Sequence, residues 1–428
     1  MGYNTLISNK LENVVINIFE GEKIRLRKID IPKLIHLLCE LTNNSSPSFR
    51  DIALQYSMKY GRHISKVAFF NFMENYLEKI LIRIIFWFLY ESNNRENIEP
   101  FGRILIQDST VIKFPDSAPD KYLGLNKRKG CKIQTHYDIL RNKYIDMEIT
   151  PFNVNEQKYS YEIKNILREN DLIIRDLGYF NSEVMRYIID ANAYFISKIQ
   201  TKTAFYDKNG KKFNLLEKLR KEQEIDMKVY ATNNKIPVRI VARKVSEEIA
   251  NRRRQKKKAD RKSNPDKRSL AILGWDILIT NIFDSSIDMD TLFNLYRLRW
   301  KIEIIFKTWK SYLNITSFHQ RISGKQVILY SLCRLINILL LDKIIISPLF
   351  NKAKKLNFQD RISYQSLVRN LSKNFVNIIY APSIKELWKI IKKIIKYSLY
   401  EKRKGKLNLK MLETITLNNL FYKNKLTL

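Results

Sequence analysis

The stretch from residue 101 to residue 200 constrains the fold more than any other part of this sequence. It opens with three segments rich in β-branched and apolar residues, which alternate with a period of two and are separated by polar turns. Strands then alternate with helices, so the pattern predicts an α/β fold with a mixed sheet and helices packed on it. The predicted elements, in chain order, are strands at 102–114, 132–140 and 143–152, a helix at 159–169, a strand at 171–176, a helix at 181–192 and a strand at 193–200.

The sheet pattern is then interrupted and resumed. Residues 201–270 hold two further predicted strands, 228–231 and 237–245, followed by a basic helix. A strand at 274–282 and a long helix at 289–312 restore the earlier scheme. We therefore expect five regions: a helical N-terminal region at 1–95, a first core part at 96–200, a β-rich insertion at 201–270, a second core part at 271–346, and a helical C-terminal region at 347–428.

Two strongly apolar stretches, 80–90 and 327–346, raise the question of a membrane span. The first is too short to cross a bilayer, and Arg334 and Asp342 interrupt the second. Both are predicted to be buried helices.

The segment 48–75 predicts two helices around Gly61, with Ser65 as the N-cap of the second. Two interpretations remain open at this point. The pair is either a helix-turn-helix whose second helix enters a DNA major groove, or a plain helical hairpin.

The charge of the chain indicates its partner. Lys and Arg number 77 against 43 Asp and Glu, which gives a formal net charge of +34. A field of one sign attracts polyanions, and phosphate contacts with counterion release then supply affinity. Nucleic acid is the expected partner, and a membrane surface fits less well because the basic residues are spread along the chain.

Cysteine and histidine usage excludes two classes of site. Three cysteines and four histidines are scattered without the spacing of a disulfide framework or a zinc site. This usage suits a reducing cytoplasm, and the first residues contain no signal-peptide core.

The densest run of cations, at 252–262, holds eight Lys or Arg against one acid. Ser246 is expected to cap this helix, with acids in its first turn. Either the run is a solvated face or it contacts DNA phosphates. The candidate contacts are Arg252, Arg253, Arg254, Lys256, Lys257 and Lys258.

Two aspartates lie at positions where burying a charged carboxylate is energetically unfavourable. Asp108 sits within an apolar strand, and Asp176 ends the apolar run 172–175. A carboxylate in such a place needs a partner or a metal ion, and the carboxyl ends of neighbouring strands are common places for sites in α/β sheets.

A third acid, Glu303, lies on the long helix at 289–312. At about 100° per residue, it shares one stripe of about 80° with a phenol and three cations. The other members of the stripe are Tyr296, Arg299, Lys307 and Lys310. Together with Asp108 and Asp176, Glu303 predicts a site for divalent ions, and hard oxygen ligands suit Mg²⁺. Two such ions can assist phosphoryl transfer.

The spacing Y-x2-R-x3-E-x6-K, met by Tyr296, Arg299, Glu303 and Lys310, resembles the YREK signature of bacterial insertion-sequence DDE transposases of the insertion sequence four type. The segments QDST at 107–110 and RDLGYF at 175–180 fit the same family, as does a β-rich insertion between the second Asp and the Glu. The resemblance covers about 95–345. It implies a ribonuclease-H-like core.

The resemblance also implies roles for these residues. Asp108, Asp176 and Glu303 would bind two Mg²⁺ ions, with Mn²⁺ as a substitute. Tyr296, Arg299 and Lys310 would hold the phosphates of a transposon end, and a homodimer would pair two ends in a synaptic complex near the bacterial nucleoid. Trp275 is either a stacking partner for a flipped base or a core aromatic, and Trp300 is expected beside the same pocket.

The expected function is therefore metal-dependent DNA cleavage and strand transfer by a cut-and-paste transposase. Two alternatives remain: another ribonuclease-H-like nuclease, such as a junction resolvase, and an inactive DNA-binding relative. The YREK stripe and the insertion speak against the first, and the complete set of acids speaks against the second.

Overall fold

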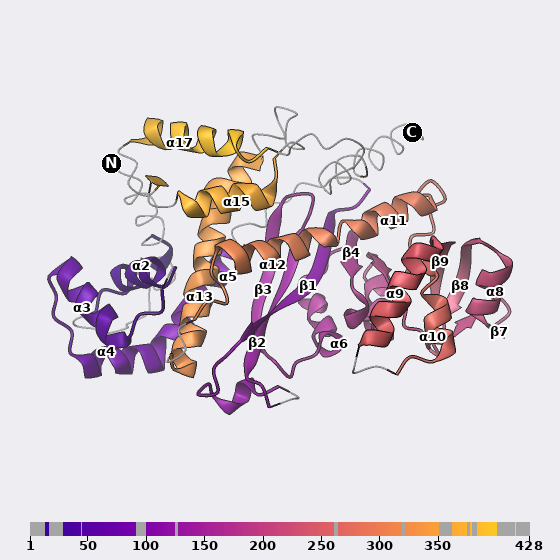
Figure 1. The fold of residues 1–428 in the computed structure, drawn as a ribbon, viewed down its shortest axis with the longest axis horizontal. Coiled ribbons are helices and arrows are strands. Elements are labelled where there is room, and N and C mark those ends of the chain that lie inside the picture. Colours follow the sequence, from indigo (N-terminus) through magenta and orange to yellow (C-terminus); the bar gives the residue numbers. More distant parts are fainter. Residues whose placement is uncertain are drawn as a thin grey trace.

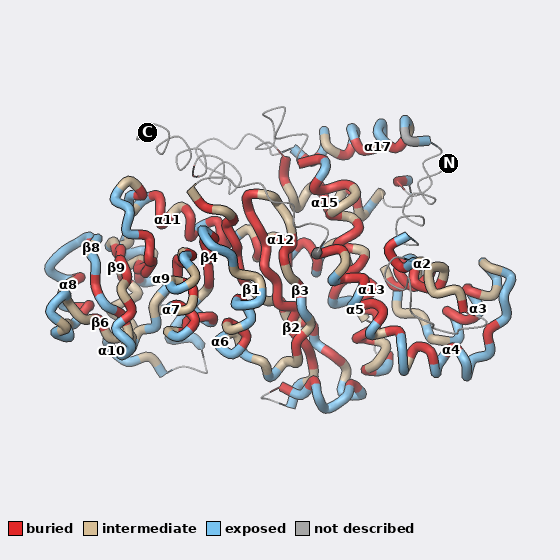
Figure 2. Tube along the Cα trace, turned by 180° about the vertical axis from the view of Figure 1, so that it is seen from behind, coloured by how far each residue is buried: buried red, intermediate tan, exposed pale blue. Residues whose placement is uncertain are grey.

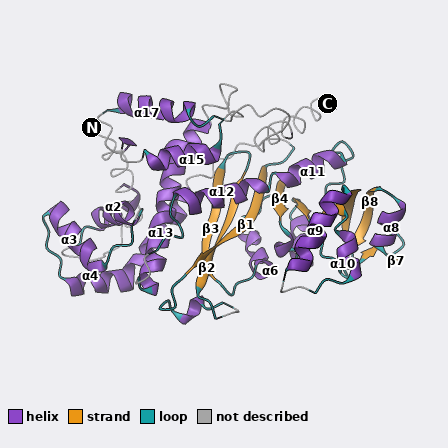
Figure 3. Cartoon of the chain, in the orientation of Figure 1, coloured by secondary structure: helices purple, strands orange, loops and turns teal. Residues whose placement is uncertain are grey.

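The computed structural model has three parts along its long axis, a helical end, a central sheet and a β-rich end (Figure 1). Figure 3 shows the strands continuing from the centre into the β-rich end, whereas the opposite end is helical. The structure describes residues 13–16, 29–43, 45–90, 100–124, 127–260, 264–318, 322–350, 362–374, 377–378, 383–399 and 416. Parts of the predicted regions 1–95 and 347–428 lie outside these residues.

The central sheet contains the five strands predicted for the core, in the predicted succession along the chain. Three antiparallel strands come first, and β4 and β5 then lie parallel to β1 in the order β3-β2-β1-β4-β5. The turn between β2 and β3 is tight, and Asn142 adopts a positive φ of 51° there, as asparagine tolerates. The strands are β1 (Arg103–Lys113), β2 (Gly130–Asp138), β3 (Lys143–Pro151), β4 (Asp171–Arg175) and β5 (Tyr194–Ser197).

The strands of the insertion extend this same sheet. β10 (Trp275–Thr280) pairs antiparallel with both β5 and β9, and the order continues as β5-β10-β9-β8-β6-β7 to give ten strands. The expected strand at 228–231 is present and begins earlier, at Glu224, and the one at 237–245 is present and shifted by one residue, to 236–244. The insertion comprises β6 (Phe205–Tyr206), β7 (Lys212–Phe213), α8 (Leu215–Lys221), β8 (Glu224–Ala231), β9 (Ile236–Lys244), α9 (Glu247–Ala259) and α10 (Lys267–Ile272).

The helical end follows the predicted capping signals. α3 (Phe49–Tyr60) begins at a capping box of Ser48 and Asp51 and ends at Gly61, whose φ is +65°. α4 (Lys66–Phe72) begins at Ser65, whose side chain accepts from the backbone of Ala68. The two-helix prediction is confirmed, and its DNA-reading role stays a prediction. The preceding helix is α2 (Ile31–Thr42), and a π-helical turn at Met73–Leu77 leads into α5 (Glu78–Tyr90).

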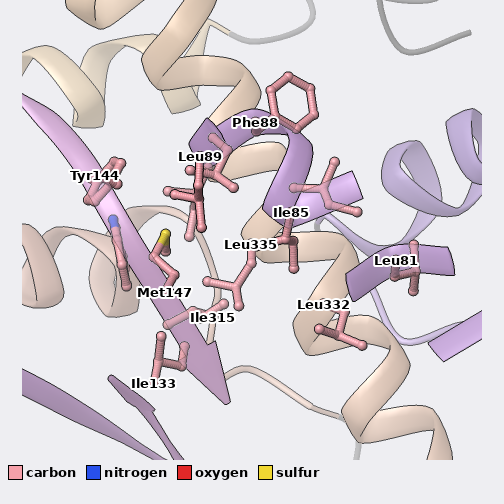
Figure 4. Packing of buried hydrophobic residues seen from close by; sticks show 14 of the residues in the cluster. Leu81, Ile85, Phe88, Leu89, Ile133, Tyr144, Met147, Ile315, Leu332 and Leu335 are labelled. Carbon is pink, nitrogen blue, oxygen red and sulfur yellow. The ribbon is translucent and has the colours of Figure 1, made fainter. Parts of the chain in front are cut away.

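Both apolar stretches are buried helices, as predicted. α5 packs against α13 (Gly324–Leu341), and together they cover the face of β2 and β3. Figure 4 shows Leu81 and Ile85 of α5 near Leu332 and Leu335 of α13, with Met147 of the sheet close by. Among the described helices, none is long and apolar enough to cross a membrane.

The central strands β1, β2 and β4 are largely buried on both faces, whereas β8 in the insertion alternates buried and exposed residues (Figure 2). Alternate residues of β1 belong to two different cores: Ile104 and Ile106 face α5, α12 and α13, whereas Leu105 faces α7 (Ser182–Asp190) and the insertion. Asp108 lies on the same face of β1 as Ile104 and Ile106. The remaining C-terminal elements, a π-helical turn at Asp342–Ile346, α15 (Tyr364–Lys373) and α17 (Ile384–Lys396), follow α13.

Two predicted helices differ from the structure. The segment 159–169 forms only a short helix, α6 (Glu156–Tyr159), which Asn155 caps earlier than expected, and a 3-10 turn at Ser160–Asn165. The predicted helix 289–312 is divided into α11 (Met289–Arg297) and α12 (Trp300–Tyr312). The division follows from i→i−3 hydrogen bonds across the junction, where Arg299 N–H bonds to Tyr296 O and Lys301 N–H to Leu298 O.

Candidate active site

The two aspartates lie side by side because β1 and β4 are parallel neighbours. Gln107 pairs with Arg175 at the end of their ladder, so the next residues, Asp108 and Asp176, stand adjacent. Asp108 is in the middle of β1, and its Oδ1 accepts from the backbone N–H of Ser109 at 2.8 Å. Asp176 directly follows the last residue of β4, where a 3-10 turn begins.

The junction of α11 and α12 brings the signature residues to this point. The Nη1 of Arg299 donates to Asp108 Oδ2 at 2.9 Å, and its Nη2 forms an ion pair with Glu303 one turn later in α12. The hydroxyl of Tyr296 donates to Asp176 Oδ1 at 3.4 Å. The three predicted carboxylates are therefore brought together, and α12 crosses in front of β1 (Figure 1).

The three carboxylates and Arg299 line a cleft of about 480 Å³. Lys307 and Lys310 of the predicted stripe also line it, and both are exposed. Trp300 is not among the lining residues, and 59% of its surface is exposed. The lining residues are Asp108, Ser109, Thr110, Asp176, Arg299, Glu303, Phe306, Lys307, Lys310 and Ser311.

Burial and crowding of like charges perturb the acids. The pKa of Asp108 is raised to about 6: burial contributes most and the negative charges of Asp176 and Glu303 add to it, against the opposing effects of Ser109 N–H and Arg299. Burial also raises the pKa of Tyr296, and the neighbouring Asp176 adds to this. The pKa of Arg299 is raised, because the surrounding acids outweigh the burial that would lower it.

The donor set fits a divalent metal ion in its chemistry. Three carboxylates in one cleft are hard oxygen ligands of the kind that Mg²⁺ prefers. The guanidinium of Arg299 lies between Asp108 and Glu303 and pairs with both. In the described part of the chain, no three His, Cys, Asp or Glu side chains stand close enough together to hold an ion.

A second cleft, of about 550 Å³, lies beside the first. Leu177, the neighbour of Asp176, lines it, together with Trp275 and the α9 cations Arg253, Lys256 and Lys257. The indole N–H of Trp275 is buried without a hydrogen-bond partner in the structure. Trp275 thus has one edge in a basic cleft, which agrees with either of its two interpretations.

Lys198 also lines the second cleft, and sequence reasoning missed it. Its Nζ lies 5.5 Å from the ring centroid of Tyr296. Burial lowers its pKa, against the attraction of Asp176. Lys198 lies within the predicted strand 193–200; in the structure it directly follows β5, the parallel neighbour of the strand that Asp176 follows.

The cations of α9 divide into two groups. Arg253 pairs with Asp276 at 2.7 Å and Arg254 with Glu247 at 3.2 Å. Another four predicted phosphate contacts are exposed, namely Arg252, Lys256, Lys257 and Lys258.

Comparisons with known proteins bear on this geometry. The family model described as a transposase DDE domain matches residues 99–338, which is more than half of the chain. The transposase for insertion sequence element IS231B of Bacillus thuringiensis subsp. berliner is 30% identical over 243 residues, which cover 50% of this chain and 51% of that protein. The transposase for insertion sequence element IS1151 of Clostridium perfringens is 26% identical over 330 residues, which cover 69% of each chain.

For most of these curated relatives, the matched part spans about half of their length. Among solved structures, the piggyBac transposase synaptic complex with hairpin DNA has a TM-score of 0.42 and 13% identity, over 96% of this chain and 88% of that one. A likeness at that level carries no functional argument. The family match covers both core parts and the residues that line the first cleft up to Ser311. The chain therefore belongs to the transposase DDE domain family.

Proposed function

We propose that this chain is a DNA transposase that cuts the ends of its element and joins them to target DNA. The observation that carries the proposal is the first cleft, where Asp108, Asp176 and Glu303 meet beside three cations. An acid cluster alone suits many metal nucleases. The adjoining cations suit an enzyme that must also hold a cleaved end for joining.

The residues of the cleft have separate tasks in this proposal. Asp108, Asp176 and Glu303 would hold two Mg²⁺ ions, with Mn²⁺ as a substitute, and such ions activate an attacking oxygen and stabilise a leaving one. Arg299, Lys307 and Lys310 bind phosphate oxygens of the transposon end. Tyr296 donates its single hydroxyl proton either to Asp176, as in the structure, or to a phosphate of the same DNA strand.

The DNA itself would lie across both clefts. The exposed cations of α9 contact the backbone, and Trp275 offers an aromatic edge to an unstacked base. Two chains pair two ends in a synaptic complex, and the reaction takes place on chromosomal DNA in the bacterial cytoplasm. The net charge of +34 favours such a polyanionic partner.

The test combines the purified chain, DNA carrying the ends of its own element, a target plasmid and Mg²⁺. Cleaved ends and joined products are expected from the wild type. The Asp108→Asn variant should cut at least about 1,000-fold more slowly, because it loses a metal ligand and leaves the reaction without its charge stabilisation. It should bind end DNA nearly as well as the wild type.

The two alternatives predict other outcomes in the same assay. A junction resolvase would cut a four-way junction and form no joined product with the plasmid. A DNA-binding relative would retain end DNA in a mobility-shift assay and cut nothing with either metal. Either result would overturn the proposal.

A further inference from the structure

Arg299 stands out among the cations of the first cleft because it is buried among the acids. Only 8% of its surface is exposed, whereas Lys307 and Lys310 are exposed at the rim. Its Nη1 and Nη2 bind different carboxylates, those of Asp108 and Glu303. Asp176, the third acid, acts on its charge as well. Arg299 is thus in electrostatic contact with the whole acid cluster.

This placement answers a physical problem. Three carboxylates that share a partly buried cleft repel one another, and burying such charges without a counter-charge is costly. The guanidinium is planar and presents several donors in a fixed fork, which lets it bridge two carboxylates at once. Arg299 therefore supplies the positive charge that allows the acids to lie together.

The same placement conflicts with metal binding. An ion shared by the acids needs oxygens of Asp108 and Glu303, and the guanidinium occupies the space between these two side chains. Two cations at one point would also repel each other strongly in a cleft of low dielectric. Metal and guanidinium cannot use these oxygens together.

We propose that Arg299 is a built-in counter-ion that competes with the first metal ion and is displaced when the ion binds. The released guanidinium then turns towards the open cleft, where a DNA phosphate accepts it. Phosphate and metal ion therefore bind cooperatively, because both are favoured by the same displacement of Arg299. Because Asp108 and Glu303 are metal ligands only under the proposed function, this role of Arg299 rests on that function.

The first measurement is the affinity for Mn²⁺, followed by electron paramagnetic resonance at fixed ionic strength and without DNA. Arg299→Ala should bind Mn²⁺ about tenfold more tightly than the wild type, which is a usual size for a coupling between two ligands of one site. Lys307→Ala is the matched control. It removes one positive charge from the same cleft without removing a bridge, and its affinity should change by less than about threefold.

A second measurement does not depend on affinity. Without metal, Arg299→Ala should melt at a lower temperature than the wild type, because the acids have lost their counter-charge. Saturating Mn²⁺ should close this gap, since an ion that binds only the folded state stabilises it. Should Arg299→Ala prove unfolded without metal, Arg299→Lys keeps a charge but cannot bridge two carboxylates in the same way, and its Mn²⁺ affinity should lie between the other two.

A third measurement compares the effect of DNA on Mn²⁺ binding in the wild type and in Arg299→Ala. A short oligonucleotide with a terminal phosphate should tighten Mn²⁺ binding in the wild type and have little effect in Arg299→Ala. Equal or weaker Mn²⁺ affinity in folded Arg299→Ala, relative to the wild type, would overturn the inference, because Arg299 would then assist the metal.

The Asp108→Asn variant distinguishes a failure of the proposed competition from a failure of the metal site itself. If it weakens Mn²⁺ binding while Arg299→Ala matches the wild type, the metal site stands and the competition is wrong. If Asp108→Asn leaves Mn²⁺ binding unchanged, the metal site itself is wrong and the proposed function fails with it.

Discussion

At the scale of single residues, buried acids are accommodated in two ways, by an ion pair or by a hydrogen bond from a neutral group. Arg103 and Asp171 form a buried ion pair at 2.5 Å, which links β1 to β4. Asp342, at the end of α13, is also buried but takes its hydrogen bond from the neutral hydroxyl of Ser347 at 3.0 Å. Burial raises the pKa of Asp342 to about 7, against the attraction of Lys143 and Lys301.

Asp342 should therefore make stability depend on pH. In the unfolded chain its pKa is about 3.9, so between about pH 4 and pH 7 only the folded state keeps the proton. The free energy of unfolding must fall as pH rises through this window. Asp342→Asn keeps the acceptor for Ser347 and does not titrate. It should be more stable than the wild type at pH 8, by about 1 kcal/mol or more.

Urea unfolding at pH 5 and pH 8 measures this difference. The advantage of Asp342→Asn over the wild type should grow from pH 5 to pH 8. An advantage of the same size at both values would show that Asp342 does not titrate in this range.

Sequence reasoning found some site residues and not others for a physical reason. Asp108 was detectable because an acid in an apolar strand is costly wherever the strand packs. Lys198 carries no such local sign, since a lysine after a strand is ordinary. Its closeness to Tyr296 depends on where β5 lies relative to α11, which is a tertiary relation.

At the scale of elements, the division between α11 and α12 changes how the signature residues meet. The stripe predicted for one continuous helix would present Tyr296 and Arg299 to the same partner. Across the divided junction, Tyr296 instead reaches Asp176 while Arg299 reaches Asp108. Helical periodicity could place the residues on one side of the chain, but it could not reveal the turn that assigns each to its own acid.

The basic helix α9 carries a prediction at this scale. DNA binding should weaken across sequences when Gln replaces four exposed cations of α9 together, because these side chains are expected to bind phosphates. The four are Arg252, Lys256, Lys257 and Lys258. The slope of log affinity against log salt should become shallower by about 0.9 for each phosphate that the variant no longer neutralises.

The matched control removes four exposed charges elsewhere on the insertion, at Lys211, Lys212, Arg220 and Lys221, and should leave the slope close to that of the wild type. Filter binding over a series of salt concentrations supplies both slopes. Equal slopes for the α9 variant and the wild type would mean that α9 is a solvated face.

At the scale of the whole molecule, the ten-stranded sheet joins the core to the insertion. The succession of the first five strands along the chain follows from local signals: three alternating segments, the last two joined by a tight turn, then strands separated by helical segments. Their order in the sheet, with β4 beside β1, does not follow from such signals. The further pairing of β10 with both β5 and β9 does not, because it joins segments distant in the sequence. The sequence predicted an insertion rich in strands, and only the folded chain shows that it continues the core sheet and brings α9 to the second cleft.

This arrangement places the acids near the middle of the molecule, between the helical end and the β-rich end (Figure 1). Under the proposed function, DNA held at the first cleft would also contact the second cleft and α9. The proposed function depends most on one claim, that the carboxylates of the first cleft hold the metal ions that support DNA cleavage.

The most direct test is end cleavage by Asp176→Cys with Mg²⁺ and with Mn²⁺. A thiolate is a softer ligand than a carboxylate and binds Mg²⁺ poorly. We expect Asp176→Cys, with the melting temperature of the wild type, to lose Mg²⁺-supported cleavage by about 1,000-fold or more and to regain part of it with Mn²⁺. Cleavage at the wild-type rate with Mg²⁺ would contradict the claim, because Asp176 would then not be a metal ligand.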